Sequence, residues 1–225
     1  MKKIILPPQS EQELLQRATQ LAGLSFTQIA KIYSCALPSN LTHAKGFIGQ
    51  LLEYALGATA GVKSRPDFEG LAVELKSIPV DKNGKPTEST YVCTVPMLSQ
   101  LGQRWRESSV YQKLAHVLWI PIQSDNSIAF SERKIGMPLL WRLPEQHEKS
   151  LKQDWEDLME QVCLGKVESI TAHQGVYLQI RPKAADSYAL REAIGSNGEK
   201  IKTLPRGFYL RTQFTRQILE QNYLS

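Results

Sequence analysis

The chain of 225 residues contains little cysteine and no pair of cysteines at a spacing that builds a site. Cys35, Cys93 and Cys163 are odd in number and far apart, which excludes the usual zinc or disulfide frameworks and indicates reduced thiols. No stretch approaches the roughly 20 apolar residues that a membrane span needs. The short apolar run at the N-terminus ends at Pro7 and Pro8, before a signal-peptide core would be complete. We therefore expect a soluble cytoplasmic protein with no membrane partner.

The sequence also lacks the motifs of several hydrolase classes. Its histidines, at positions 43, 116, 147 and 173, show no metal-ligand spacing, and no serine sits in a nucleophile-elbow pattern. The stretch Gly195 to Gly198 is too short for a phosphate-binding loop and lacks the required lysine, so it predicts a turn. Zinc hydrolases, serine hydrolases and P-loop enzymes are thus disfavoured.

Composition and charge are those of a globular protein with a modest preference for polyanions. The chain is 42% hydrophobic and 22% charged, with a net charge of +5 and a pI near 9.0. Eight basic and four acidic residues between Arg181 and Ser225 contribute +4 of that charge. The excess of positive charge therefore lies in the C-terminal part of the chain.

Apolar periodicity and capping residues predict an α/β protein. Helices are expected at Ser10–Gly23, Ser25–Tyr33, His43–Leu56, Glu145–Leu164 and Thr212–Tyr223. Strands are expected at 68–80, Glu88–Val95, Val176–Arg181 and Phe208–Arg211, while Val110–Ile122 reads as a helix entering a buried strand. A turn at Asn83 and Gly84 predicts that the first two strands form a hairpin.

The stretch Arg65 to Val80 (RPDFEGLAVELKSIPV) carries the clearest chemistry. In a strand, Glu74 and Lys76 project from one face and Leu75 from the other, because side chains alternate with period two. Asp67 follows Pro66 directly. Two carboxylates and a lysine in this arrangement are typical of metal-dependent nucleases; the alternative is an exposed strand face that carries an ion pair.

The spacing of this trio imposes a bend. A straight strand would separate Asp67 from Glu74 by roughly 23 Å, too far to share a cation. The chain must therefore fold back, and Glu69 and Gly70 are the expected bend, since glycine tolerates a tight reversal. Two carboxylates and the carbonyl of Leu75 would then suit Mg²⁺, with Mn²⁺ or Ca²⁺ as substitutes.

Other charged residues near this stretch have two interpretations each. Helical periodicity places Glu53 opposite the apolar arc of its helix, which favours a solvated side chain; the alternative is a carboxylate that helps to hold a metal. Lys113, at the edge of an apolar run, is either a surface lysine or a group near the reacting phosphate. Three further basic residues are either solvated or in contact with a phosphate backbone: Lys45, Lys63 and Arg65.

The two C-terminal strands carry candidate base-reading residues. In Val176–Arg181, burial of Val176, Leu178 and Ile180 would leave Tyr177, Gln179 and Arg181 on a polar face. Tyr209 is expected on the polar face of the other strand. Arginine can contact guanine bidentately and tyrosine can contact a base or its methyl group, although exposed residues of both types are common.

Long stretches of the chain resemble the MutH family of methyl-directed mismatch-repair endonucleases, within the restriction-endonuclease-like superfamily. The resemblance covers nearly the whole length and rests on KGFIGQLLEYALGATAG from Lys45, DFEGLAVELKSIPV from Asp67, KLAHVLWIPI from Lys113, LKQDWEDLMEQVCLGK from Leu151, LQIRPKAADS from Leu178 and LPRGFYLRTQFT from Leu204. Shared stretches of this length in one order are far more specific than the trio alone.

The resemblance implies a role for individual residues. Asp67, Glu74 and Lys76 match the family's catalytic residues, Glu53 an acidic residue that assists metal binding, and Lys113 a second lysine near the scissile phosphate. The matches in the DNA-reading region are the loop residues Arg181, Pro182, Lys183 and Ala184, the methylation-sensing Tyr209, and Tyr91. Two of these positions depart from the family's pattern, because Ala184 often aligns with glycine and Tyr91 can align with phenylalanine.

The resemblance also implies fold, activity and partners. We expect a restriction-endonuclease-like mixed β-sheet flanked by helices, in one nuclease domain (1–225) whose two arms form a DNA-binding clamp: a metal-binding core at about 43–122 and a DNA-reading arm at about 145–225. The implied enzyme is a monomer that nicks the unmethylated strand of hemimethylated GATC, 5′ of the G, when MutL, recruited by MutS, activates it. Two alternatives remain: a GATC-type restriction endonuclease that cuts both strands, and a non-catalytic DNA-binding module.

Overall fold

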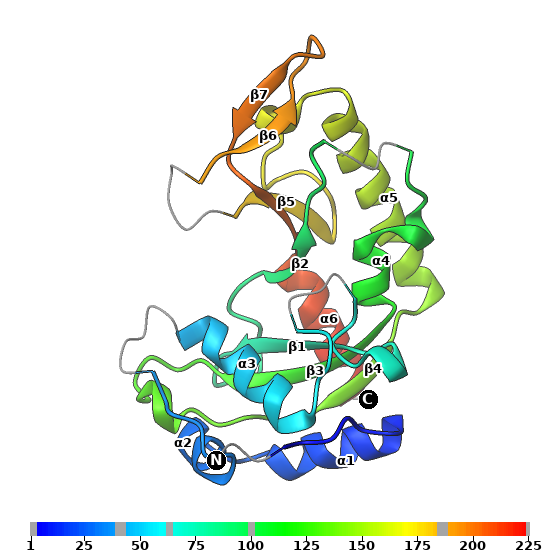
Figure 1. The fold of residues 1–225 in the computed structure, drawn as a ribbon. Helices are drawn as coiled ribbons and strands as arrows, with labels where there is room; N and C mark the ends of the chain where they lie inside the picture. Colours follow the sequence, from blue (N-terminus) through cyan, green and yellow to red (C-terminus); the bar gives the residue numbers. More distant parts are fainter. Residues whose placement is uncertain (1–3, 39–43, 62–64, 99–101, 184–188, 224–225) are drawn as a thin grey trace. The chain divides into compact units, whose positions relative to one another are not determined.

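The structure, a computed structural model, describes residues 4–38, 44–61, 65–98, 102–183 and 189–223, without the side chains of Ala44 and Lys45 (Figure 1). The chain forms two compact units. The first comprises residues 1–88 and 116–142, with residue 225, and the second comprises 89–115 and 143–224. Within the described ranges, no helix is long and apolar enough to cross a membrane.

The first unit packs three helices on one face of a mixed three-stranded sheet. Its elements are α1 (Glu11–Leu21), α2 (Phe26–Ile32), α3 (Ala44–Leu56), β1 (Glu74–Val80), β3 (His116–Gln123) and β4 (Leu139–Arg142), with the 3₁₀ turns η2 (Glu69–Leu71) and η4 (Phe130–Glu132). The strand order is β1-β3-β4, with β1 parallel to β3 and β4 antiparallel. Leu118 and Ile120 of β3 join the apolar residues of all three helices in one core.

Local signals in the sequence determine the ends of these helices. The Ser10 hydroxyl accepts a hydrogen bond from the Glu13 amide at the start of α1, and Ser25 and Gln28 form a complete capping box at the start of α2. The chain leaves α3 at Gly57, which has a φ of 81°. The helices predicted from Ser10 and Ser25, and the one predicted to end at Leu56, are confirmed to within about two residues.

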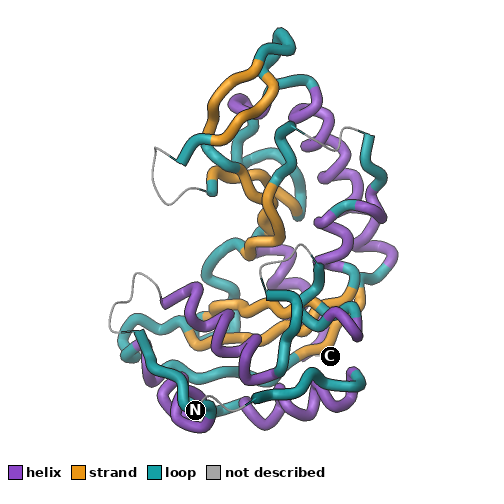
Figure 2. The backbone as a smooth tube through the Cα atoms, viewed as in Figure 1, coloured by secondary structure: helices purple, strands orange, loops and turns teal. Residues whose placement is uncertain are grey.

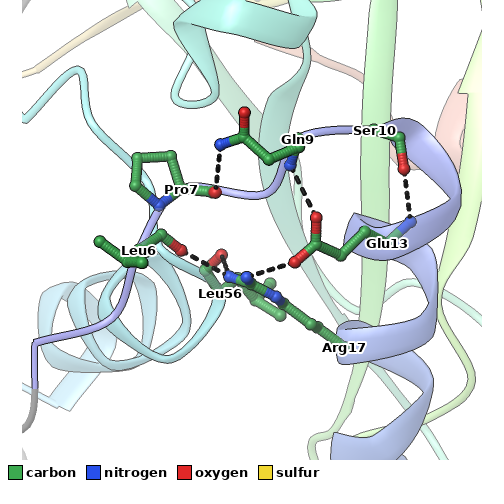
Figure 3. Close-up of polar contacts among 7 residues, drawn as sticks. All are labelled: Leu6, Pro7, Gln9, Ser10, Glu13, Arg17 and Leu56. Atoms are coloured by element: carbon green, nitrogen blue, oxygen red, sulfur yellow. Dashed lines mark hydrogen bonds and ion pairs between the residues drawn. The ribbon is translucent and has the colours of Figure 1, made fainter.

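Arg17 ties the N-terminal segment to the end of α3 (Figure 3). Its guanidinium donates to the carbonyl oxygens of Leu6 at 2.7 Å and Leu56 at 3.3 Å and also pairs with Glu13. Gly57 lies against the same segment, and a β-carbon there would approach the Leu6 carbonyl oxygen to 2.6 Å. The contact between the N-terminal segment and the end of α3 therefore requires a glycine at position 57.

The second unit combines three helices with two antiparallel sheets (Figure 2). Its elements are η3 (Trp105–Glu107), α4 (Ser109–Leu114), α5 (Glu145–Cys163), η5 (Val167–Ser169), α6 (Thr212–Tyr223), β2 (Thr90–Thr94), β5 (Leu178–Pro182), β6 (Arg191–Ile194), β7 (Lys200–Thr203) and β8 (Arg206–Leu210). The larger sheet has the order β2-β8-β5, and β6 pairs with β7. The helices predicted at Glu145–Leu164 and Thr212–Tyr223 are confirmed, as is the helix that enters a strand within Val110–Ile122.

The predicted hairpin of 68–80 with Glu88–Val95 is wrong. The turn at Asn83 and Gly84 does form, but its ladder ends near the bridge between Val80 and Pro86. Pro79 and Pro86 cannot donate hydrogen bonds, which prevents a regular extension of the ladder. Instead, β1 pairs with β3 and β2 pairs with β8. The two strands therefore belong to different sheets.

Three of the described strands were not predicted, and one was predicted to begin two residues too early. The missed strands are β4, β6 and β7, which have only four residues each. The strand predicted from Val176 begins at Leu178, and Val176 is 58% exposed rather than buried. Gln179, predicted on a polar face, is buried. The turn predicted at Gly195 to Gly198 is confirmed as the tip of the β6–β7 hairpin.

Candidate functional site

The chain folds back between Asp67 and Glu74. Phe68 and Val73 exchange backbone hydrogen bonds across a tight reversal that contains η2, with N–O distances of 2.9 and 3.3 Å. The predicted bend at Glu69 and Gly70 is therefore confirmed. The residue in the left-handed conformation, however, is Ala72 with a φ of 51°, and Gly70 does not have a positive φ. Only the last seven residues of the predicted strand 68–80 form β1.

The reversal brings the side chain of Asp67 to the start of β1. Its Oδ2 accepts a hydrogen bond from the amide of Leu75 at 2.8 Å. Its backbone carbonyl accepts from the amides of Thr59 and Ala60, which follow α3. Asp67 is 8% exposed, so its carboxylate is held in a largely desolvated position beside the residue that follows Glu74.

Glu74 and Lys76 form a buried ion pair on one face of β1. Lys76 Nζ lies 3.0 Å from Glu74 Oε1, and the two side chains are 6% and 5% exposed. Lys76 stands next to the fully buried Trp119 in the parallel register of β1 and β3. Burying an ion pair costs desolvation free energy that a hydrophobic pair would not cost. A buried acid and base adjoining a second carboxylate are therefore more typical of a functional site than of a stabilising device.

Two carboxylates, Asp67 and Glu74, are the acidic donors that the reversal and β1 bring together. Glu53 lies on α3, half-buried, with contacts of its own. In the described parts of the chain, no three acidic, histidine or cysteine side chains form a group that could hold a metal ion. Mg²⁺ needs only one or two protein carboxylates because it keeps several waters, so the donor pair fits such an ion.

The remaining residues proposed near the catalytic centre are distributed as follows. Lys113 is half-buried on α4 of the second unit, three residues before β3 begins. Arg65 is exposed and pairs with Glu69 at 3.1 Å. Lys45 lies on α3, but its side chain, like the whole of Lys63, lies outside the described residues.

A second cluster forms on the sheet of the second unit. Tyr91 of β2 and Tyr209 of β8 are cross-strand partners whose ring centroids lie 5.3 Å apart. The Arg181 guanidinium lies 5.7 Å from the Tyr209 ring, and Lys183 Nζ lies 3.6 Å from the Tyr91 ring. Four predicted DNA-reading residues therefore share one surface. Pro182 ends β5, and Ala184 lies outside the described residues.

Two residues that the sequence analysis missed shape this cluster. Ser89 accepts a hydrogen bond from Arg181 at 2.7 Å, which orients the guanidinium. A β-carbon at Gly207 would lie about 3 Å from both tyrosine rings, so only glycine leaves them room. Glycine inside the strand pattern of LPRGFYL was a usable signal for such a close approach. Burial, and then the neighbouring Tyr91, raise the pKa of Tyr209 despite the opposing effect of Arg181, so its phenol stays neutral at physiological pH.

Asp154 of α5 and Arg211, just after β8, hold the segment that leads into β5. The Asp154 carboxylate, 4% exposed, accepts hydrogen bonds from the amides of Val176, Tyr177 and Leu178 at 2.6 to 2.8 Å. Arg211 donates to three backbone carbonyls of the same segment, those of Ala172, Gln174 and Gly175. Neither residue was predicted, because their partners are backbone groups that sequence patterns do not specify.

A buried acid–acid–lysine constellation on a mixed sheet, together with a separate arginine, lysine and tyrosine surface, is typical of enzymes that act on nucleic acids. Comparison with known proteins gives the particular family. A family model described as "DNA mismatch repair enzyme MutH" matches residues 56–154. The DNA mismatch repair protein MutH of Vibrio cholerae serotype O1 is 54% identical over 216 residues, which cover 96% of this chain and 98% of that protein.

Two further relatives have the same name. The MutH protein of Vibrio parahaemolyticus is 50% identical over 97% of this chain and 96% of its own length. That of Escherichia coli O17:K52:H18 is 49% identical over 99% of this chain and 97% of its own length. The chain therefore belongs to the MutH family of DNA mismatch repair enzymes, and the family predicted from the sequence is confirmed.

Proposed function

We propose that this protein is a Mg²⁺-dependent endonuclease that nicks the unmethylated strand of hemimethylated GATC, 5′ of the G, during mismatch repair. The observation that carries this proposal is the buried ion pair of Glu74 and Lys76 beside the hydrogen-bonded carboxylate of Asp67. Membership of a family of DNA mismatch repair enzymes supports DNA as the substrate. The proposed fold is restriction-endonuclease-like, with two arms, at about 43–122 and about 145–225, that form a DNA-binding clamp.

Asp67 and Glu74 would hold the cation, helped by Glu53 and the carbonyl of Leu75. When bound, Mg²⁺ would supply Lewis-acid stabilisation of the negative charge that develops on the phosphate. Mn²⁺ or Ca²⁺ would occupy the same position. Asp67 is already fixed by the Leu75 amide, so its carboxylate would need little rearrangement when the ion binds.

Lys76 would orient the attacking water and stabilise developing negative charge. Its burial beside Trp119 places the ammonium where water screens its field only weakly. Loss of its contact with Glu74 on metal binding would free the ammonium for the water and the phosphate. Lys113 is proposed as a second cation near the scissile phosphate.

The surface around Tyr91 and Tyr209 would read the DNA. Arg181 would contact guanine in the major groove, the adjoining loop Pro182 to Ala184 would follow the groove, and Tyr209 would sense the adenine methyl group. Lys183 would contact the DNA beside this loop, and Lys45, Lys63 and Arg65 would contact phosphates near the catalytic centre. The proposed partners are MutL, which activates the enzyme, and MutS, which acts through MutL on a monomer.

Strand-specific nicking tests the proposal. Unmethylated, hemimethylated and fully methylated GATC duplexes would be incubated with Mg²⁺, with and without MutL, using wild type and Glu74→Ala. We expect nicks in the unmethylated strands only, stimulation by MutL, and a loss of at least 100-fold in Glu74→Ala. The control is Glu132→Ala. Like Glu74, Glu132 lies two residues before a lysine, but the stretch of sequence around it is polar.

Each alternative predicts a different outcome. Nicking by Glu74→Ala at the wild-type rate would refute the site assignment. Early linear product from a supercoiled plasmid would support a restriction endonuclease that cuts both strands. Binding of DNA without any Mg²⁺-dependent cleavage, unchanged by EDTA, would support a non-catalytic DNA-binding module.

A further inference from the structure

Two antiparallel ladders, β5 with β8 and β6 with β7, follow one another along the chain as one interrupted two-stranded ribbon. Leu178 to Pro182 pair with Leu210 to Arg206, and the ladder continues through the amide of Lys183, which donates to the carbonyl of Pro205 at 2.7 Å. Pairing resumes with Arg191 opposite Thr203. Between the two ladders the first strand has eight residues, 183–190, and the second has two, 204–205. The stretch of chain that links β5 to β6 is therefore six residues longer than the stretch that links β7 to β8, and the proposed DNA-reading residues Arg181 to Ala184 lie where it begins.

The distal half of this ribbon, the β6–β7 hairpin, is fixed to its own unit. Gly165 follows α5 with a φ of 71°, and a β-carbon there would collide with the carbonyl of Gly195 at the hairpin tip. Ala193 and Thr203, which share one face of the hairpin, are 1% and 4% exposed. One face of the hairpin is thus packed against its own unit, and the hairpin follows β5 and leads into β8 (Figure 1).

The opposite face of the hairpin carries two exposed lysines. Lys200 and Lys202 are two residues apart on β7 and so project from the same face. Glu192, across from Lys202, lies 3.9 Å from Lys200, and these two side chains are 54% and 75% exposed. A surface pair of this kind contributes little to stability, so packing does not account for the lysines. Two cations against one carboxylate leave this face positive.

The chain length limits how far this positive face lies from the reading residues. Lys200 precedes Arg206, the partner of Pro182, by six residues, which span at most about 20 Å in an extended strand. DNA rises about 3.4 Å per base pair. The lysines can therefore reach phosphates up to about six base pairs from the point that Pro182 and Lys183 contact.

We propose that Lys200 and Lys202 bind the phosphate backbone of DNA flanking the recognition sequence, on the side to which the ribbon extends. This proposal rests on the proposed function, in which the Arg181 to Ala184 loop reads the DNA. The chemistry is charge neutralisation of a phosphodiester backbone by exposed ammonium groups, which is independent of sequence. The flanking contacts would add affinity without changing which sequence is recognised.

Equilibrium binding to duplexes of two lengths tests the proposal. One duplex would have two base pairs on each side of GATC and the other twelve, and affinity would be measured by fluorescence anisotropy over a salt series. For Lys200→Ala/Lys202→Ala we expect about tenfold weaker binding to the long duplex, a salt slope reduced by about 2, and unchanged binding to the short duplex. Lys200→Arg/Lys202→Arg should bind the long duplex like the wild type.

The matched control is Lys149→Ala/Lys152→Ala, which removes two exposed lysines from α5 of the same unit. Unchanged binding of the lysine-to-alanine hairpin variant to the long duplex would overturn the proposal, as would an equal loss on both duplexes or an equal loss in the α5 control. Normal DNA binding with a loss of stimulation by MutL would also overturn it and point to a protein partner. Wild-type preference for GATC over a scrambled duplex tests the proposed function separately.

Discussion

Gly57 and Gly70 differ in how strictly the structure requires a glycine. Gly57 has a positive φ, and a β-carbon there would lie 2.6 Å from the Leu6 carbonyl oxygen, whereas a β-carbon at Gly70 would meet nothing within 4 Å. The sequence suggested that Gly70 makes the bend before β1. In the structure, Ala72 adopts the left-handed conformation instead, and it does so beside the proposed catalytic residues; strained backbone is common at functional sites.

Alanine substitution at Gly57 should therefore reduce stability strongly, whereas alanine substitution at Gly70 should have little effect. We expect Gly57→Ala to lower the free energy of unfolding by roughly 2 to 3 kcal/mol, because it combines a left-handed φ with a backbone clash. Gly70→Ala should change it by less than about 0.5 kcal/mol. Urea unfolding of both variants checks the prediction, and a large destabilisation by Gly70→Ala would contradict it.

At the scale of elements, a buried carboxylate holds the segment that leads into β5. Asp154 of α5 satisfies three successive backbone amides just before and at the start of β5. Arg211 holds the carbonyl groups of the same segment. Because β5 carries Arg181, these contacts connect the position of a helix to the position of a candidate DNA-reading residue.

Asp154→Ala should leave these three amides without their acceptor. Each of these hydrogen bonds to a charged carboxylate contributes about 1 kcal/mol or more, so we expect a loss of about 3 kcal/mol in the free energy of unfolding. We also expect weaker binding to GATC duplexes, since β5 would be less well ordered. The control is Asp157→Ala on the exposed side of α5, which should cost less than about 0.5 kcal/mol. Equal stability of the two variants would show that Asp154 does not hold the segment.

At the scale of the whole molecule, the chain passes between the two units three times up to Tyr223, the last described residue. Residues 89–115 belong to the second unit although they lie between two segments of the first. They supply β2, which pairs with β8 and makes it the central strand of the β2-β8-β5 sheet. This division differs from the boundaries of about 43–122 and 145–225 suggested by the family resemblance.

A fragment of residues 143–225 should therefore not fold by itself. It contains β5 and β8 but lacks β2, so β8 would become an unpaired edge and Phe208 and Leu210 would lose packing partners. We expect no cooperative thermal transition in circular dichroism. A sharp transition in the fragment, comparable with that of the full chain, would contradict this expectation.

The sequence by itself determined the helix boundaries, the acid–acid–lysine trio and the family. Helix ends depend on neighbouring residues, as at Ser10, Ser25 and Gly57, so local signals are sufficient. Only the tertiary structure decided that β1 pairs in parallel with β3. It also decided that Tyr91 and Tyr209, more than a hundred residues apart, are cross-strand partners. Strand pairing depends on contacts between distant segments, and a period-two pattern does not specify the partner. The trio could thus be recognised from the sequence. The burial of the Glu74–Lys76 ion pair and the clustering of four side chains could not: Tyr91, Tyr209, Arg181 and Lys183.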